Sequence, residues 1–151
     1  RWVAKSSLFK IPFVGWAIWA SGYIPVERGD RKKSYQAFMA TIESLKGGNS
    51  IVIFPEGTRS ADGTIGPFKK GGPLLSIRSG APLVPVTLLG TGNIIKKGSG
   101  IIRPGKVQII ISPAIPSQAV ADDREDAVLD QIRNIICENY AALSVKTGSG
   151  D

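Results

Sequence analysis

Residues 51–60 read Ile51-Val52-Ile53-Phe54-Pro55-Glu56-Gly57-Thr58-Arg59-Ser60, an apolar run followed at once by a polar loop that contains glycine. Four consecutive apolar residues have the length of a strand and predict one that is covered on both faces of its sheet. Pro55 has no backbone donor and cannot continue a central strand, so the chain must turn there. Because ligands of open α/β sheets bind outside the carboxyl ends of strands, residues 55–60 form a candidate site.

The loop carries groups that suit an anion. Gly57 lets the backbone approach a ligand closely and expose its N–H groups. Arg59 offers a planar fork of donors for phosphate or carboxylate, and Thr58 adds a hydroxyl. Glu56 lies within one turn of Arg59. Two interpretations follow: an anion or oxyanion site, or a polar turn in which Glu56 and Arg59 pair with each other.

Helix and strand patterns alternate around this stretch. Residues 31–46 predict a helix that Asp30 caps and Gly47 ends. Its expected core-facing residues recur at helical spacing: Tyr35, Phe38, Met39, Ile42 and Leu45. Further strands are expected at residues 1–5, 24–26, 83–89 and 107–111, helices at residues 74–79 and 122–143, and a loop at residues 90–105. The order predicts an α/β fold with a mixed central sheet flanked by helices.

Composition narrows the classes of function. The chain has 151 residues, of which 42% are apolar, and its net charge of +7 favours anionic partners such as phosphates, lipid surfaces or nucleic acid. No nucleic-acid motif occurs, so we expect no nucleic-acid partner. The absence of histidine excludes a histidine base or histidine metal site within this chain, and we expect no metal. Cys137, the single cysteine, lies on an apolar stripe and is expected to fill the core.

The segment from Ser6 to Tyr23 is rich in apolar and aromatic residues. Its uninterrupted apolar run, residues 11–20, is too short to span a bilayer. Two interpretations stay open. The segment is a buried loop with a short helix, or it is an interfacial segment whose tryptophans lie at the level of lipid headgroups beside basic residues.

Four segments resemble the PlsC-type 1-acylglycerol-3-phosphate O-acyltransferases, a family of glycerolipid acyltransferases. Residues 54–60, Phe-Pro-Glu-Gly-Thr-Arg-Ser, resemble the third motif of the family. Residues 22–28 are similar to the second motif and residues 83–86 to the fourth, and two stretches, residues 3–8 and 11–15, are similar to the segment just before the second motif. The first motif, His-x-x-x-x-Asp, is absent and is expected upstream of Arg1. We therefore expect a partial acyltransferase domain at residues 1–145 and a flexible tail at residues 146–151.

The resemblance also implies roles for individual residues. Glu56 and Gly57 would belong to the catalytic loop, with Glu56 holding Arg59 or the acceptor and Gly57 supplying backbone donors to an oxyanion. Four residues would contact the substrate, mostly through its phosphate: Lys5, Arg28, Thr58 and Arg59. Lys69 and Lys70 could meet coenzyme A phosphates or lipid headgroups, or form a solvated pair. The general base would be the upstream histidine, so the chain alone is expected to be inactive.

The expected function is transfer of a fatty acyl group to the free hydroxyl of a lysoglycerophospholipid, turning 1-acyl-glycerol-3-phosphate into phosphatidic acid in phospholipid biosynthesis. The resemblance implies no cofactor, with acyl-CoA or acyl-carrier protein as the co-substrate. The expected partners are the lysophospholipid, the acyl thioester, a membrane surface and, as a candidate, acyl-carrier protein, and the expected location is the cytoplasmic face of a membrane. The alternatives are acylation of another lysolipid, a non-catalytic module that binds anionic lipid, and a protein that binds soluble phosphates.

Overall fold

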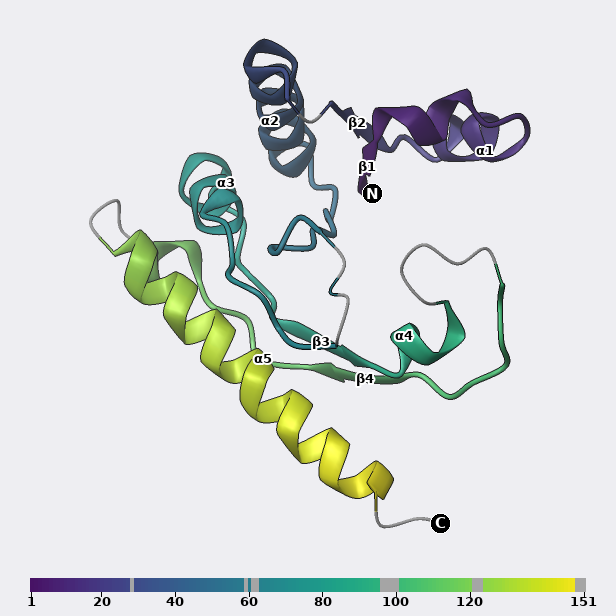
Figure 1. The fold of residues 1–151 in the computed structure, drawn as a ribbon. Helices are drawn as coiled ribbons and strands as arrows, with labels where there is room; N and C mark the ends of the chain where they lie inside the picture. Colours follow the sequence, from purple (N-terminus) through teal and green to yellow (C-terminus); the bar gives the residue numbers. More distant parts are fainter. Residues whose placement is uncertain (28, 59, 61–62, 96–100, 121–123, 149–151) are drawn as a thin grey trace.

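The computed structural model describes residues 1–27, 29–58, 60, 63–95, 101–120 and 124–148, with side chains described as far as residue 144. The elements run in the order β1 (Val3–Lys5), η1 (Ser6–Lys10), α1 (Val14–Ala20), β2 (Ile24–Val26), α2 (Arg31–Lys46), α3 (Gly71–Ser79), β3 (Val86–Leu89), α4 (Thr91–Ile94), β4 (Gln108–Ile111), η2 (Ser117–Ala119) and α5 (Glu125–Gly148). Figure 1 shows the short strands among these helices, with α5 passing across β3 and β4. Parallel and antiparallel strand pairs flanked by helices confirm the predicted α/β class.

The N-terminal part of the fold is built from parallel strands. β1 pairs with β2 in parallel, in a register that places Val3 opposite Ile24 and Lys5 opposite Val26. On its other side, β1 is extended by a parallel bridge between Trp2 and Val52. The chain after β1 crosses over through η1 and α1, and the chain after β2 crosses over through α2. Parallel neighbours require such crossovers, and the carboxyl ends of all three extended segments therefore face the same edge.

The C-terminal part of the fold is antiparallel. β3 pairs with β4, and an isolated bridge joins Leu83 to Ile115. The helix α5 lies against this pair, and its apolar side contributes to a core cluster of Ile115, Val120, Val128 and Ile132. The buried Thr87 hydroxyl lies 3.4 Å from the side-chain amide nitrogen of Asn139 on α5. The hydrogen-bonded strands thus form two small sheets rather than one continuous ladder.

The helix α2 begins and ends where the sequence predicts. The Asp30 carboxylate accepts a hydrogen bond of 3.0 Å from the Lys33 amide, so Asp30 is the predicted N-cap. The predicted buried stripe is correct at Ile42 but wrong at Tyr35 and Met39, which are exposed. The small residues Ala37 and Thr41 are buried instead, on a helix that packs against both β2 and α3.

The prediction that residues 51–54 are covered on both faces is wrong. Ile51 and Ile53 are partly buried, whereas Val52 and Phe54 are 41% and 58% exposed. The separate strand β4 shows the same alternation between partly buried and exposed side chains, and its exposed residues are Ile109 and Ile111. A run without polar residues hides the two-residue period of a strand, so the sequence could not show which face is open.

The segment from residue 6 to residue 23 folds as η1 and α1, which pack against each other. The prediction of a buried loop is wrong, because the largest side chains of this segment, including Trp16 and Trp19, are exposed. None of the helices in the described part of the chain has the length and apolar character needed to cross a bilayer.

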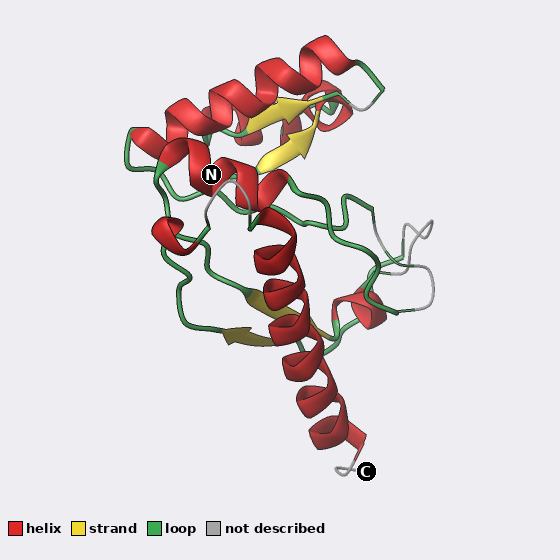
Figure 2. Ribbon diagram, turned by 90° about the vertical axis from the view of Figure 1, so that its left-hand side faces the viewer, coloured by secondary structure: helices red, strands yellow, loops and turns green. Residues whose placement is uncertain are grey.

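Several boundaries differ from the sequence prediction: α3 begins at Gly71 rather than at residue 74, and β3 begins at Val86 rather than at residue 83. The segment expected to be a loop at residues 90–105 contains the helical turn α4, and part of it, residues 96–100, lies outside the described residues. The helix α5 begins at Glu125 and continues through Gly148, beyond the predicted end at Leu143. Figure 2 shows the C-terminal turns of α5 extending past the strands. The division at residue 145 stays a prediction.

Candidate active site

The candidate site lies where the parallel strands end. Lys5 is the last residue of β1 and is paired in register with Val26, the last residue of β2. Trp2 is bridged to Val52, so Lys5 lies level with Pro55 on the other side of β1. One edge of the sheet therefore receives an exposed lysine from β1 and the start of the 55–60 loop. This is the position where α/β folds bind ligands.

The loop turns sharply at Gly57. The Gly57 amide donates a hydrogen bond of 3.0 Å to the Phe54 carbonyl, and the φ angle of Gly57 is +70°. A residue with a side chain would be strained in this left-handed conformation. The Gly57 N–H itself closes the turn, and the role of Gly57 in supplying backbone donors to an oxyanion stays a prediction.

Glu56 braces the loop through a hydrogen bond to the segment that follows it. Its carboxylate oxygen Oε2 accepts a hydrogen bond of 2.9 Å from the Gly66 amide. A Cβ atom on Gly66 would lie only 3.1 Å from the same oxygen, so glycine allows this close approach. A second tie joins the Lys69 amide to the Pro55 carbonyl at 2.9 Å. Two hydrogen bonds therefore join the loop to the segment that leads into α3.

Lys69 and Lys70 have different surroundings. The ammonium group of Lys70 lies 2.8 Å from Asp126 on α5, and this hydrogen bond raises the pKa of Lys70. The side chain of Lys69 instead lies over the loop, where its Nζ and Cε atoms would be 3.0 and 3.1 Å from a Cβ atom on Gly57. Of the two lysines, only Lys69 reaches the candidate site. The sequence showed two adjacent lysines, but it did not show which of them lies over the loop and which pairs with Asp126.

The basic cluster after β2 is partly neutralised. Lys33 lies 2.7 Å from Glu27, and the hydrogen bond between them, together with the charge of Glu27, raises the pKa of Lys33. A cavity of about 410 Å³ opens beside this pair at the carboxyl end of β2. Its lining residues come from η1, β2 and α2: Ser6, Ile24, Pro25, Glu27, Lys33, Gln36, Ala37 and Ala40. The cavity begins one residue after Lys5, next to the same strand edge.

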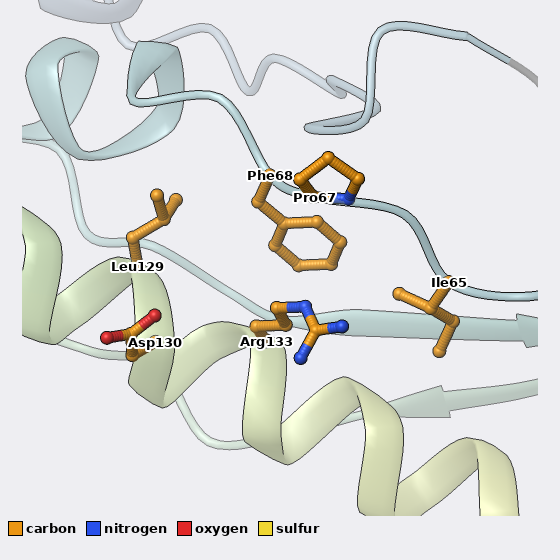
Figure 3. Close-up of a pocket in the computed structure, with 6 residues that line it drawn as sticks. All are labelled: Ile65, Pro67, Phe68, Leu129, Asp130 and Arg133. Atoms are coloured by element: carbon orange, nitrogen blue, oxygen red, sulfur yellow. The ribbon is translucent and has the colours of Figure 1, made fainter.

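A second cavity, of about 430 Å³, lies between the segment after the loop and α5. Figure 3 shows Ile65, Pro67 and Phe68 on one wall and Leu129, Asp130 and Arg133 of α5 on the other. None of the predicted site residues that the structure describes lines it. We therefore take the strand edge, and not this cavity, as the candidate site.

The structure brings four of the six predicted site residues to one region. Lys5 and the loop residues Glu56, Gly57 and Thr58 share the edge where the parallel strands end. Thr58 is exposed there. Arg28 and Arg59 lie outside the described residues, and so does the predicted pairing of Arg59 with Glu56. Sequence reasoning did not find Gly66, whose amide holds Glu56 and which no motif marks.

The candidate site thus consists of an exposed lysine at the end of β1 and a braced polar loop, both at the carboxyl ends of parallel strands in an α/β fold. Residues 1–89, which include β1, the loop and β3, match the family model described as acyltransferase. The chain belongs to this acyltransferase family. The predicted membership of an acyltransferase family is therefore confirmed.

Relatives agree with this assignment. The chain is 38% identical to the chloroplastic 1-acyl-sn-glycerol-3-phosphate acyltransferase BAT2 of Brassica napus, over 95% of this chain and 41% of that protein. It is 31% identical to the 1-acyl-sn-glycerol-3-phosphate acyltransferase of Borreliella burgdorferi, over 95% of this chain and 57% of that protein. The crystal structure of the LPA acyltransferase PlsC from Thermotoga maritima matches with a TM-score of 0.81 and 31% identity, over 95% of this chain and 56% of that one. The chain thus spans about half the length of the relatives it matches.

Proposed function

We propose that the protein containing this chain transfers a fatty acyl group to the free hydroxyl of 1-acyl-glycerol-3-phosphate and forms phosphatidic acid. The observation that supports the proposal is the shared edge of the parallel strands, where Lys5 ends β1 and the braced loop begins with Lys69 lying over Gly57. The relatives named 1-acyl-sn-glycerol-3-phosphate acyltransferases support the choice of acceptor. A phosphate monoester at this edge would face two lysine side chains.

The reaction needs no covalent intermediate on the protein. The acceptor hydroxyl oxygen attacks the carbonyl carbon of the acyl thioester, and its proton passes to a general base. The tetrahedral intermediate then collapses, the carbon–sulfur bond breaks, and the thiolate leaves and takes up a proton. General-base catalysis contributes roughly 100- to 10,000-fold to such a step. This chain holds no histidine, so the family's histidine base would come from another part of the protein.

The described residues would bind and orient the acceptor. Lys5 and Lys69 would hold the phosphate from two sides of the loop, since one ends β1 and the other lies across Gly57. We propose Arg59 and Arg28 as further phosphate ligands, and Thr58 as a residue that braces the loop, from the family's motifs. Fixing the phosphate fixes the distance from it to the reacting hydroxyl, which lowers the entropic cost of reaching the transition state.

Glu56 and Gly57 would act by shaping the loop. Glu56 accepts a hydrogen bond from the Gly66 amide and would thereby fix the position of the loop relative to the segment before α3. Gly57 allows the tight turn and leaves room for the Lys69 side chain. Their contribution is preorganisation, because donors and charges fixed in place before the reaction need no rearrangement during it.

We further propose acyl-CoA or acyl-carrier protein as the acyl donor and the cytoplasmic face of a membrane as the location. Relatives that are lipid acyltransferases are consistent with association of the protein with a membrane. No separate cofactor is needed, because the thioester already carries the activated acyl group.

The full-length protein tests the proposal in an acyl-transfer assay with both donors. Each donor is paired with 1-acyl-glycerol-3-phosphate, or with a lysolipid that has the same acyl chain and a phosphodiester headgroup. We expect kcat/KM to be at least about 10-fold higher for the monoester, because its second negative charge is recognised by the basic edge. Equal rates would favour a broad lysolipid acyltransferase. Binding of both lipids without transfer from either donor would favour a non-catalytic lipid-binding module.

A further inference from the structure

Three aromatic side chains form an exposed ridge on the segment after β1. Phe13, Trp16 and Trp19 are 77%, 68% and 75% exposed, and we call them the aromatic ridge. Their spacing of three residues places them on one side of α1. Leu8, Ile11 and Val14 are also exposed and extend the apolar surface. An exposed apolar patch of this kind marks a site of interaction with a protein or a membrane.

The backbone presents the ridge in a fixed geometry. Phe13 has φ +61° and ψ −52°, and the Val14 amide donates to the Pro12 carbonyl at 2.7 Å. These values describe a γ-turn of the strained kind that is rare in proteins. Because the Phe13 side chain is 77% exposed, burial of that side chain does not account for the strained backbone, which fixes the direction in which the ring projects.

Close packing of α1 on η1 adds to this rigidity. Gly15 is buried, and a Cβ atom at this position would lie 2.2 Å from the Phe9 carbonyl oxygen. The rings of Phe13 and Trp16 also meet edge to face, with centroids 5.4 Å apart. The ridge is therefore a preformed surface and not a set of loose side chains.

Charge around the ridge identifies the partner. Residues 2–26 contain Lys5 and Lys10 and no acidic residue. Lys10 lies at the end of η1, directly before the apolar residues. Tryptophan is the residue that most favours the headgroup level of a bilayer, and lysine beside it adds attraction to anionic lipids. Binding to a protein partner would not require tryptophan rings flanked by lysines with no acidic residue among residues 2–26.

The position of the ridge relative to the candidate site fits the same partner. The segment η1 begins directly after Lys5, so the ridge and the proposed phosphate ligand belong to one continuous stretch. Figure 1 shows α1 at the extremity of the molecule, away from α5. A bilayer in contact with this extremity would lie near the strand edge.

We infer that the aromatic ridge inserts into the interfacial layer of an anionic bilayer, with Lys10 among the lipid phosphates, and holds the strand edge at the membrane surface. The lysolipid would then reach the site without leaving the bilayer. Only this last consequence rests on the proposed function, because insertion of the ridge does not depend on catalysis.

The test uses the full-length protein and vesicles of phosphatidylcholine and phosphatidylglycerol whose acyl chains carry bromine. We expect the bromolipid to quench tryptophan emission, and we expect this quenching to be lost in the double variant Trp16→Phe/Trp19→Phe. A double variant Trp16→Gln/Trp19→Gln should bind vesicles at least about 10-fold more weakly. Tyr35→Gln, an exposed aromatic change on α2, is the matched control and should bind as the wild type does.

The outcomes separate this inference from the proposed function. Acyl transfer to a short-chain lysolipid below its micelle concentration should be unchanged in Trp16→Gln/Trp19→Gln, provided that circular dichroism shows the same fold. Quenching without any acyl transfer would overturn the proposed function and leave the ridge assignment standing. Equal quenching in the wild type and the Phe double variant would overturn the assignment. Ridge tryptophans that are shielded from water in the absence of vesicles would also overturn it, because another segment or a second copy would then cover them.

Discussion

At the scale of single residues, two neighbouring lysines show how tertiary contacts separate like side chains. Lys70 is bound to Asp126, which comes from a helix more than fifty residues later in the chain. Lys69 lies instead against Gly57, where the absence of a side chain makes room for it. Glycine at this position therefore serves two purposes, the left-handed turn and the approach of a cation.

Replacing Lys69 with Ala in the full-length protein should raise the KM for 1-acyl-glycerol-3-phosphate by about 10-fold. One charge-assisted hydrogen bond to the phosphate would be lost. Lys70→Ala removes the same charge from the neighbouring position and should change the KM by less than about 2-fold, since its ammonium group is engaged by Asp126. Steady-state kinetics with varied acceptor measure both. If the two variants weaken binding equally, Lys69 contributes only to the general positive charge of the surface.

At the scale of elements, the segment from β1 to α1 is short and still well defined. β1 has only three residues, but it has parallel neighbours on both sides. α1 has seven residues, fewer than an isolated helix needs in water. Its stability must come from the contact with η1, and Gly15 is the residue that allows this contact.

Replacing Gly15 with Ala should push α1 away from η1 and disorder the aromatic ridge. The added methyl group would overlap the Phe9 carbonyl oxygen, and overpacking of this kind costs about 1–3 kcal/mol. The ridge tryptophans should then bind vesicles more weakly and show altered emission. Gly92→Ala in α4 is the matched control, because nothing lies within 4 Å of a Cβ atom there. Unchanged emission and binding in Gly15→Ala would show that α1 does not depend on this close contact.

At the scale of the whole molecule, parallel and antiparallel parts have different tasks. The parallel part positions the candidate site, and the antiparallel part is held together by the core cluster that α5 completes. One face of the strands carries exposed apolar residues in both parts, among them Phe54 and Ile111. Among the described helices, α5 packs against β3 and α2 packs against β2.

The core cluster should dominate the stability of the antiparallel part. Replacing Ile132 with Ala should lower the free energy of unfolding by about 3 kcal/mol, because it leaves a cavity beside Val128 and Ile115. Ile111→Ala removes the same atoms from a side chain that is 72% exposed and should cost less than about 1 kcal/mol. Urea unfolding of the full-length protein measures both. A similar loss in the two variants would mean that another part of the protein buries Ile111.

Local signals were enough to predict the ends of α2, the N-cap at Asp30, the turn at Pro55 and the family. Each depends on residues that are close in the sequence: a carboxylate beside the first free amides, a missing backbone donor, a motif in one loop. Local signals failed for the exposed face of residues 51–54 and for the inward face of α2. Which face is exposed depends on which element packs against it. An apolar run or stripe has the same composition whether that face is covered or open, so the sequence does not distinguish the two.

The amino-acid order alone thus established the class of fold, the position of the candidate loop and the relationship to the acyltransferases, because motifs and caps act over a few residues. Folding in three dimensions was needed to place Lys69 over Gly57, to engage Lys70 with Asp126 and to expose the aromatic ridge. These contacts join residues from distant segments or depend on what packs against a face. Such pairings are set by packing and charge in the folded chain, which the spacing of residues along the sequence does not encode.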